Sequence, residues 1–322
     1  MSSVPKNLNA GVGDIREAQL QLDQLVADAG QIILGKETEL RLAIACLVAR
    51  GHLLIEDIPG VGKTTLGQVL ARTMGLSFRR IQFTSDLLPA DILGASVYLR
   101  DSATFEFHPG PIFSQVVLAD EVNRATPRTQ SALLEAMEEA QVTVEGDTHP
   151  LSQPFFVIAT QNPSNQIGTF ALPESQLDRF LMRIELGYPD TSAERALLKG
   201  RDRREMLTEL TATLTADKLI ELQSQADNVH VADALLDYLQ DLLEFSRNSS
   251  DFTNGLSPRA GLAVLRAARA WALMGGRAAV LPEDVQRVLP SVIGHRLRSN
   301  EDGEGQSGLG LAQRLLQAVP IP

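Results

Sequence analysis

The first half of the chain alternates short apolar runs with segments whose apolar residues recur at helical spacing. The apolar runs predict β-strands at residues 52–56, 78–82, 115–120, 155–160 and 182–185. The helical spacing predicts helices at 18–34, 38–50 and 127–140, and a helix that follows the first strand. Alternation of this kind is typical of a parallel sheet with flanking helices, so we expect an α/β fold.

Two stretches interrupt the alternation with a strand, a polar turn and a second strand. One covers residues 97–107 and turns at Asp101-Ser102; the other covers 142–151 and turns at Glu145-Gly146-Asp147. Polar and glycine-containing turns between short apolar runs are typical of antiparallel pairs. We therefore expect two β-hairpins inserted into the α/β domain.

After Pro189 the strand pattern ends and only helical patterns follow. Thr191 and Glu194 form a capping-box pattern that predicts the first of these helices. Further on, Ser257 and Pro258 supply a cap and a first-turn proline, which puts Arg259 in the first turn of an alanine-rich helix. A length of 322 residues also favours two domains. We divide the chain into a flexible N-terminus at 1–15, an α/β domain at 16–189 and a smaller all-α domain at 190–322.

Composition narrows the class of protein. Hydrophobic residues make up 44% and charged residues 21%, which is typical of a packed soluble protein. The net charge of −11 disfavours binding to nucleic acid or to anionic membranes. The sequence contains neither a signal peptide nor an apolar run long enough to span a membrane, so we expect a cytoplasmic protein. The single cysteine, Cys46, lies in an apolar helical run and is expected to be buried rather than reactive.

The segment between the first strand and its helix is typical of a phosphate-binding loop. Consecutive backbone N–H groups and the helix N-terminus form a surface of donors that matches a triphosphate. The pattern G-x-x-x-x-G-K-[ST] assigns Lys63 to the β and γ phosphates and the Thr64 hydroxyl to Mg²⁺. The predicted nucleotide-binding residues are Gly35, Pro59, Gly60, Val61, Gly62, Lys63, Thr64 and Thr65.

One position departs from that pattern, because Asp57 replaces its first glycine. Aspartate tolerates left-handed backbone geometry, so the loop can still form if the carboxylate points away from the phosphates. The alternative interpretation is a simple Gly/Pro turn with an ordinary surface lysine. The apolar strand before the loop and the helix after it favour nucleotide binding.

Polar residues follow two later strands at the ends that face the predicted nucleotide. Asp120 is expected to hold Mg²⁺ through water and Glu121 to polarise the attacking water. Asn162 follows the next strand and could orient that water or contact the γ phosphate. The alternatives are solvated acids at a strand end and a turn-forming asparagine before Pro163.

Phosphoryl transfer also requires cations that stabilise the developing charge, and arginine is the planar donor best suited to this. Arg179 and Arg259 are the candidates. The alternative for each is a surface arginine that forms an ordinary ion pair.

Taken in chain order, these motifs resemble those of the MoxR family of AAA+ ATPases. The matching segments are Glu56-Asp57-Ile58-Pro59-Gly60-Val61-Gly62-Lys63-Thr64, Asp120-Glu121-Val122-Asn123-Arg124-Ala125, Ala159-Thr160-Gln161-Asn162-Pro163 and Leu172-Pro173-Glu174-Ser175-Gln176-Leu177-Asp178-Arg179-Phe180. The stretch from residues 82–91 through 108–113 looks like that family's helix-2 insert, and residues 142–151 look like its pre-sensor-1 hairpin.

The resemblance implies a role for each candidate residue. Asn162 would be sensor 1, Arg179 the arginine finger that acts on a neighbouring subunit, and Arg259 sensor 2 on an α-helical lid domain. It also implies that Asp57 is tolerated. The catalytic set would then be Lys63, Glu121, Asn162, Arg179 and Arg259, with Thr64 and Asp120 as metal ligands.

The resemblance further implies an assembly and an activity. A finger offered to another subunit requires a ring, in this family a hexamer, and ATP with Mg²⁺ as the cofactors. Family members are thought to act as chaperones that remodel or mature a client protein, often beside a protein with a von Willebrand factor A domain. The client is not indicated by the sequence.

Two other functions fit the same phosphate loop. A DNA-acting ring related to helicases would need basic hairpin tips, but here the hairpins carry Asp101, Glu106, Glu145 and Asp147 beside Arg100. A slow switch that binds ATP as a signal would not need Glu121 for rapid hydrolysis. Substitution of Glu121 therefore distinguishes a motor from a switch.

Overall fold

The computed structural model describes residues 12–162, 169–300 and 308–321. Its centre is a five-stranded parallel sheet in the order β2-β5-β8-β1-β9, which confirms the predicted α/β fold. The strands are β1 (His52–Glu56), β2 (Phe78–Gln82), β5 (Val116–Asp120), β8 (Phe156–Gln161) and β9 (Phe180–Ile184). Each lies within two residues of its predicted position. Residues 1–11 of the predicted flexible N-terminus, and Pro163 of the third motif, lie outside the described residues.

Alternate residues of each strand face opposite sides of the sheet, and each side has its own apolar core. Leu53 and Ile55 of β1 pack on one side with helices α1 (Val12–Gly30), α2 (Glu37–Val48) and α3 (Lys63–Thr73). Leu54 packs on the other side with α4 (Pro89–Leu93) and α5 (Pro127–Glu139). Cys46 is buried on α2, as expected.

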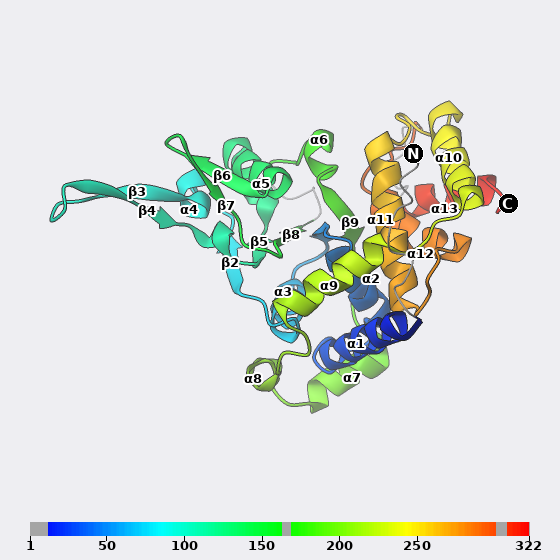
Figure 1. The fold of residues 1–322 in the computed structure, drawn as a ribbon, viewed down its shortest axis with the longest axis horizontal. Coiled ribbons are helices and arrows are strands. Elements are labelled where there is room, and N and C mark those ends of the chain that lie inside the picture. Colours follow the sequence, from blue (N-terminus) through cyan, green and yellow to red (C-terminus); the bar gives the residue numbers. More distant parts are fainter. Residues whose placement is uncertain (1–11, 163–168, 301–307, 322) are drawn as a thin grey trace, which may run out of the picture.

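Two hairpins project from the second side of the sheet, and both were predicted. The first pairs β3 (Gly94–Leu99) with β4 (Thr104–Pro109), and the second pairs β6 (Gln141–Val144) with β7 (Asp147–Pro150). Figure 1 shows β3 and β4 as a long arm that extends away from the body of the molecule. At its base, the Phe107 ring stacks on the His149 ring of the second hairpin at 4.1 Å, which ties the two hairpins together.

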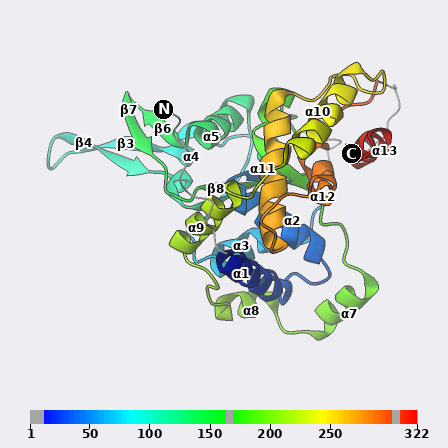
Figure 2. The same cartoon turned by 45° about the vertical axis from the view of Figure 1, so that its right-hand side comes forward.

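The chain after β9 is helical. It contains α7 (Thr191–Lys199), α8 (Arg203–Glu209), α9 (Ala216–Asp227), α10 (Asp233–Asn248), α11 (Pro258–Met274), α12 (Pro282–Ile293) and α13 (Gly308–Ala318), after the short α6 (Glu174–Leu177) that precedes β9. Figures 1 and 2 show α10 to α13 at the opposite end of the molecule from the hairpin arm. Helix α11 packs against α1, α2 and α9, so one apolar core runs from the sheet into the helical region.

Three local expectations can be compared with the structure. Helix α1 begins at Val12 and ends at Gly30, earlier at both ends than predicted. The capping box predicted at Thr191 is wrong, because Asp190 caps α7 and accepts hydrogen bonds from the backbone N–H groups of Ser192 and Ala193. Ser257 does cap α11.

Within the described residues, no helix is both long and apolar enough to cross a membrane.

Candidate nucleotide site

The loop between β1 and α3 has the backbone geometry of a phosphate-binding loop. Gly60 and Gly62 adopt φ of 89° and 96°, a region that side chains other than glycine rarely occupy. Gly62 is the cap residue of α3, so the N-terminus of that helix opens onto the loop. A cavity of about 320 Å³ lies over it, lined by Pro59, Gly60, Gly62, Lys63, Thr64, Thr65, Asp120, Glu121 and Asn162.

Two predicted nucleotide-binding residues do not line that cavity. Val61 packs partly against the apolar core beside α3. Gly35 lies in the connection between α1 and α2 with φ of 69°, and a Cβ atom there would lie 2.9 Å from the Cβ of Ala193 and 3.2 Å from Oδ2 of Asp190. Glycine at this position allows the close approach of α7.

Lys63 is buried at the start of α3 and points across the ends of the strands. Its Nζ donates to the backbone oxygen of Asp57 at 2.5 Å and to Oδ1 of Asn162 at 2.9 Å. Burial lowers the pKa of Lys63, and the nearby Asp57, Asp120 and Glu121 carboxylates oppose that effect. The amine is therefore held among oxygen atoms, where a phosphate can replace a carbonyl as acceptor.

The Asp57 carboxylate points away from the phosphate loop, as the sequence required. Its Oδ2 accepts hydrogen bonds from the backbone N–H groups of Leu186 and Gly187, both at 2.6 Å. Its Oδ1 accepts from the N–H group of Ile58 at 2.7 Å. The carboxylate thus fastens the loop to the chain that follows β9, and its negative charge is stabilised by hydrogen bonds from backbone N–H groups rather than directed at a nucleotide.

Asp120 faces Thr64 across the cavity. The Thr64 hydroxyl lies 3.4 Å from Oδ2 of Asp120, and that oxygen also accepts two hydrogen bonds from Arg80 of β2, at 2.6 and 3.0 Å. The Thr160 hydroxyl donates to Oδ1 at 2.6 Å. Asp120 is therefore oriented by donors on both neighbouring strands.

Glu121 has a left-handed backbone conformation, with φ of 57° and ψ of 48°. This geometry is uncommon for glutamate and turns the side chain towards the cavity. The carboxylate accepts hydrogen bonds from Asn162 Nδ2 and Gln82 Nε2, each at 3.1 Å, and from Arg124 Nη1 at 2.9 Å. Three side chains thus fix its direction.

Hard oxygen donors at this position fit a magnesium ion. Thr64 and Asp120 supply a hydroxyl and a carboxylate on facing sides of the cavity. Within the described residues, no cluster of three or more His, Cys, Asp or Glu side chains could hold a metal ion by itself. Mg²⁺ commonly keeps several waters and takes further ligands from nucleotide phosphates, so it needs few ligands from the protein itself.

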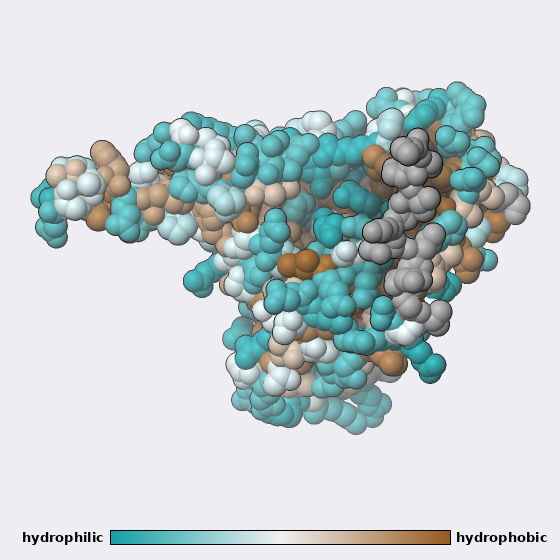
Figure 3. Space-filling model, viewed as in Figure 1, coloured by the Kyte–Doolittle hydropathy of each residue, from teal (hydrophilic) through white to brown (hydrophobic). Residues whose placement is uncertain are grey.

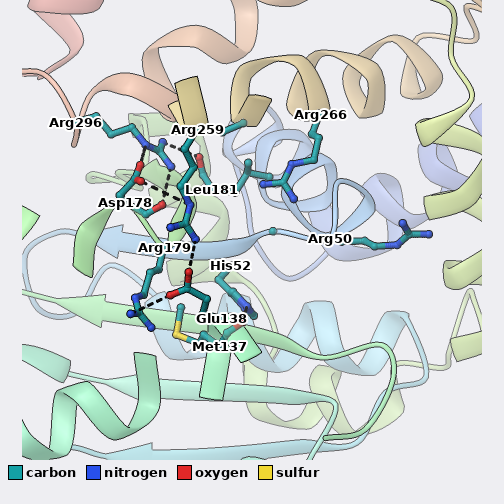
Figure 4. A pocket seen from close by; sticks show the side chains of 12 residues that line it. Arg50, His52, Met137, Glu138, Asp178, Arg179, Leu181, Arg259, Arg266 and Arg296 are labelled. Carbon is teal, nitrogen blue, oxygen red and sulfur yellow. Dashed lines mark hydrogen bonds and ion pairs between the residues drawn. The ribbon is translucent and has the colours of Figure 1, made fainter. Parts of the chain in front are cut away.

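The two candidate arginines lie together, but away from this cavity. Arg179 and Arg259 both contact Glu138 of α5, at 2.9 and 3.1 Å, as Figure 4 shows. They line a separate cavity of about 220 Å³, which shares no lining residue with the cavity over the phosphate loop. The fold therefore gathers Lys63, Thr64, Asp120, Glu121 and Asn162 at one place and the two arginines at another.

Several site residues were not identified from the sequence. Arg80 and Gln82 of β2 hold Asp120 and Glu121, as do Thr160 and Arg124. The signal available was that Arg80 and Gln82 alternate with the buried Ile81, which puts both on one side of a strand. Their partners could not be identified without knowing that β2 lies next to β5.

Comparison with known proteins gives consistent matches along the chain. The model of the ATPase family associated with various cellular activities (AAA) matches residues 52–182, and that of the AAA lid domain matches residues 244–313. The first match contains the phosphate loop, Asp120, Glu121, Asn162 and Arg179, and the second contains Arg259.

Relatives of known name match nearly the whole chain. Chaperone MoxR1 of Mycobacterium tuberculosis is 38% identical over 94% of this chain and 82% of its own length. The uncharacterized protein YeaC of Bacillus subtilis is 41% identical over 94% of this chain and 95% of its own length. The solved structure of a suspected ATPase from Cytophaga hutchinsonii superposes with a TM-score of 0.87 at 34% identity, over 96% of this chain and 97% of that one.

Proposed function

Because the chain belongs to the MoxR family of AAA+ ATPases, we propose that it binds ATP with Mg²⁺ and hydrolyses it to ADP and phosphate. One observation carries the proposal. Lys63 and Thr64 of the phosphate loop share a single cavity with Glu121, at the ends of three neighbouring parallel strands. Ligands of open α/β sheets bind at the carboxyl ends of the strands, so this cavity lies where a triphosphate is expected.

Each side chain has a role that follows from its contacts. Lys63 neutralises the terminal phosphates. Glu121 polarises the attacking water, and Asn162 keeps Glu121 in place through the hydrogen bond from its amide. Thr64 and Asp120 would hold Mg²⁺, which supplies charge neutralisation at the phosphates.

We assign Arg179 to a neighbouring subunit's nucleotide rather than to that of its own chain. The support is its position, since neither Arg179 nor Arg259 lines the cavity over the phosphate loop. An arginine that completes the site of another chain requires a ring, and we propose a hexamer. We also propose that the chain consists of a nucleotide-binding domain at 16–189 and a lid domain at 190–322.

A protein client fits the surface better than a nucleic acid. Val97, Tyr98 and Phe105 are exposed large hydrophobic residues on the hairpin arm. Figure 3 shows brown residues along this arm. Asp101 and Glu106 on the same hairpin would repel phosphates. The name of one relative, Chaperone MoxR1, also supports a protein client. We propose chaperone-like remodelling of a client protein in the cytoplasm, beside a partner with a von Willebrand factor A domain.

The deciding experiment replaces Glu121 with Gln, which keeps its shape and removes its charge. The variant is expected to bind ATP with affinity close to the original and to hydrolyse it at least about 100-fold more slowly. Calorimetry measures binding and phosphate release measures hydrolysis. An unchanged rate would remove Glu121 from the mechanism, and a folded protein that takes up no ATP with Mg²⁺ would contradict the whole proposal.

A further inference from the structure

Glu138, near the end of α5, bridges the two arginines that do not reach the phosphate loop. Its Oε2 lies 2.9 Å from Nη2 of Arg179, and its Oε1 lies 3.1 Å from Nη2 of Arg259. In Figure 4 its carboxylate lies between the two guanidinium groups, with a dashed line to each. One side chain of the sheet domain therefore contacts both a residue beside β9 and a residue in the first turn of α11.

Each arginine also has a second anchor. Arg179 donates from Nη1 to the backbone oxygen of Leu134, one turn before Glu138 on α5. Nε of Arg259 lies 3.7 Å from Oδ2 of Asp178, and Oδ1 of Asp178 accepts from the buried Arg296 at 2.7 Å. The bridge thus belongs to a network that joins α5 to α11 and to the segment after α12.

The cavity beside this network has an excess of positive charge. Arg179, Arg259, Arg266 and Arg296 line it together with only two carboxylates, Glu138 and Asp178. Arg50 also lines it, but pairs with Asp227 and points away from the others in Figure 4. Burial lowers the pKa of Arg266, for which the described residues show no ion pair. A cluster of guanidinium groups that outnumber their carboxylate partners attracts an anion, and planar guanidinium groups suit phosphate.

Glu138 holds these arginines without locking them. The Arg259 side chain is about half exposed, and so the ion pair with Glu138 is individually weak. A triphosphate carries more negative charge than one carboxylate and can compete for both guanidinium groups. Before that encounter, the two oxygens of one carboxylate fix the spacing and direction of two long side chains that would otherwise sample many rotamers.

We propose that Glu138 is a positioning residue that holds Arg179 and Arg259 of one chain side by side, so that both meet the same triphosphate on a neighbouring chain. The inference rests on the proposed action of Arg179 between subunits. It adds that the finger and the lid arginine work as one unit, because a single carboxylate links them. Glu138 itself touches no nucleotide in this scheme.

The test is Glu138→Gln in the full-length protein, with Glu139→Gln as the matched control. Glu139 is the next residue on α5 and makes no ion pair in the described parts of the chain. We expect Glu138→Gln to lower kcat about tenfold. The affinity for ATP should stay within about twofold of that of the original protein, because Glu138 lies outside the cavity over the phosphate loop. The control should change neither. Glu138→Asp, whose shorter side chain cannot reach both arginines, should behave as Glu138→Gln.

A double-mutant comparison separates positioning from a general structural effect. If Glu138 acts through the arginines, adding Glu138→Gln to a variant that lacks both of them, Arg179→Ala with Arg259→Ala, should lower the residual kcat no further, whereas a structural effect would lower it by the same factor in both backgrounds. An unchanged kcat in Glu138→Gln, or an equal loss in both backgrounds, would overturn the inference while leaving the ATPase intact. If Arg179→Ala alone leaves hydrolysis unchanged, the result contradicts the proposed action of Arg179 between subunits, on which this inference rests.

Discussion

Lys63 and Asn162 are in direct contact, with the lysine Nζ 2.9 Å from the asparagine Oδ1. The other end of the same amide donates to Glu121 at 3.1 Å. A neutral side chain therefore stands between the cation that faces the phosphates and the acid assigned to activate water. The position of one amide links nucleotide binding to the proposed chemical step.

We expect Asn162→Ala to lower kcat about 100-fold with little change in ATP affinity. The variant releases Glu121 from one of its three donors, whereas Lys63 and the backbone of the phosphate loop remain to bind the nucleotide. Steady-state hydrolysis and calorimetry check this. A loss confined to affinity would mean that Asn162 supports binding rather than chemistry.

Asp57→Asn is expected to lower the free energy of unfolding by about 2 kcal/mol. The carboxylate accepts from Leu186 N and Gly187 N on one oxygen, and an amide cannot offer two acceptor oxygens to these donors and to Ile58 N. Urea denaturation provides the measurement. The nearby surface variant Glu185→Gln is the control, and an equal effect of the two would contradict this role of Asp57.

Stability should fall as pH is lowered below about 6.5, because His52 is buried in its neutral form. Burial lowers the pKa of His52 from 6.5 to about 4. Its Nδ1 accepts from the N–H group of Val157 and its Nε2 lies 3.1 Å from the backbone oxygen of Met137, so the ring has no free position for a second proton. The unfolded chain binds that proton first, and the stability present above pH 6.5 is lost as pH falls towards 4.

For His52 alone the loss between pH 7 and pH 5 is about 2 kcal/mol. The pKa of His295 is lowered in the same direction, first by burial and then by the charge of Arg296, so it adds to the effect. Denaturation curves at the two pH values should show a smaller difference in His52→Gln than in the original protein. Identical pH dependence in the two proteins would contradict the assignment.

Mixing two impaired variants tests whether Arg179 acts between chains. Arg179→Ala keeps an intact phosphate loop, and Lys63→Ala keeps an intact Arg179. In a mixed ring, a Lys63→Ala chain can supply its arginine to the site of an Arg179→Ala neighbour, so some hydrolysis should return. Activity is measured across mixing ratios, with each variant alone as the baseline. No recovery at any ratio would count against the assignment.

Local patterns in the sequence were sufficient to predict the elements and part of the site. Alternating and helical spacing located the five strands within two residues, and the polar turns located both hairpins. The phosphate loop, Asp120 and Glu121 could be recognised from their neighbours in the sequence. The loop's glycines and lysine lie between a strand and a helix, and the two acids lie at the end of a strand. Even the direction of Asp57 followed from the requirement that a carboxylate avoid phosphates.

Contacts between distant segments were decided only by the tertiary structure. Arg80 reaches Asp120 because β2 pairs with β5, and Arg259 reaches Glu138 because the fold brings the first turn of α11 to the end of α5; neither neighbour is encoded by spacing along the chain. The residue that caps α7 also differed from the predicted one, since Asp190 and Thr191 both carry an oxygen that can accept from the first turn and the backbone geometry selects between them. Local chemistry specifies which groups are available, whereas packing decides which of them meet.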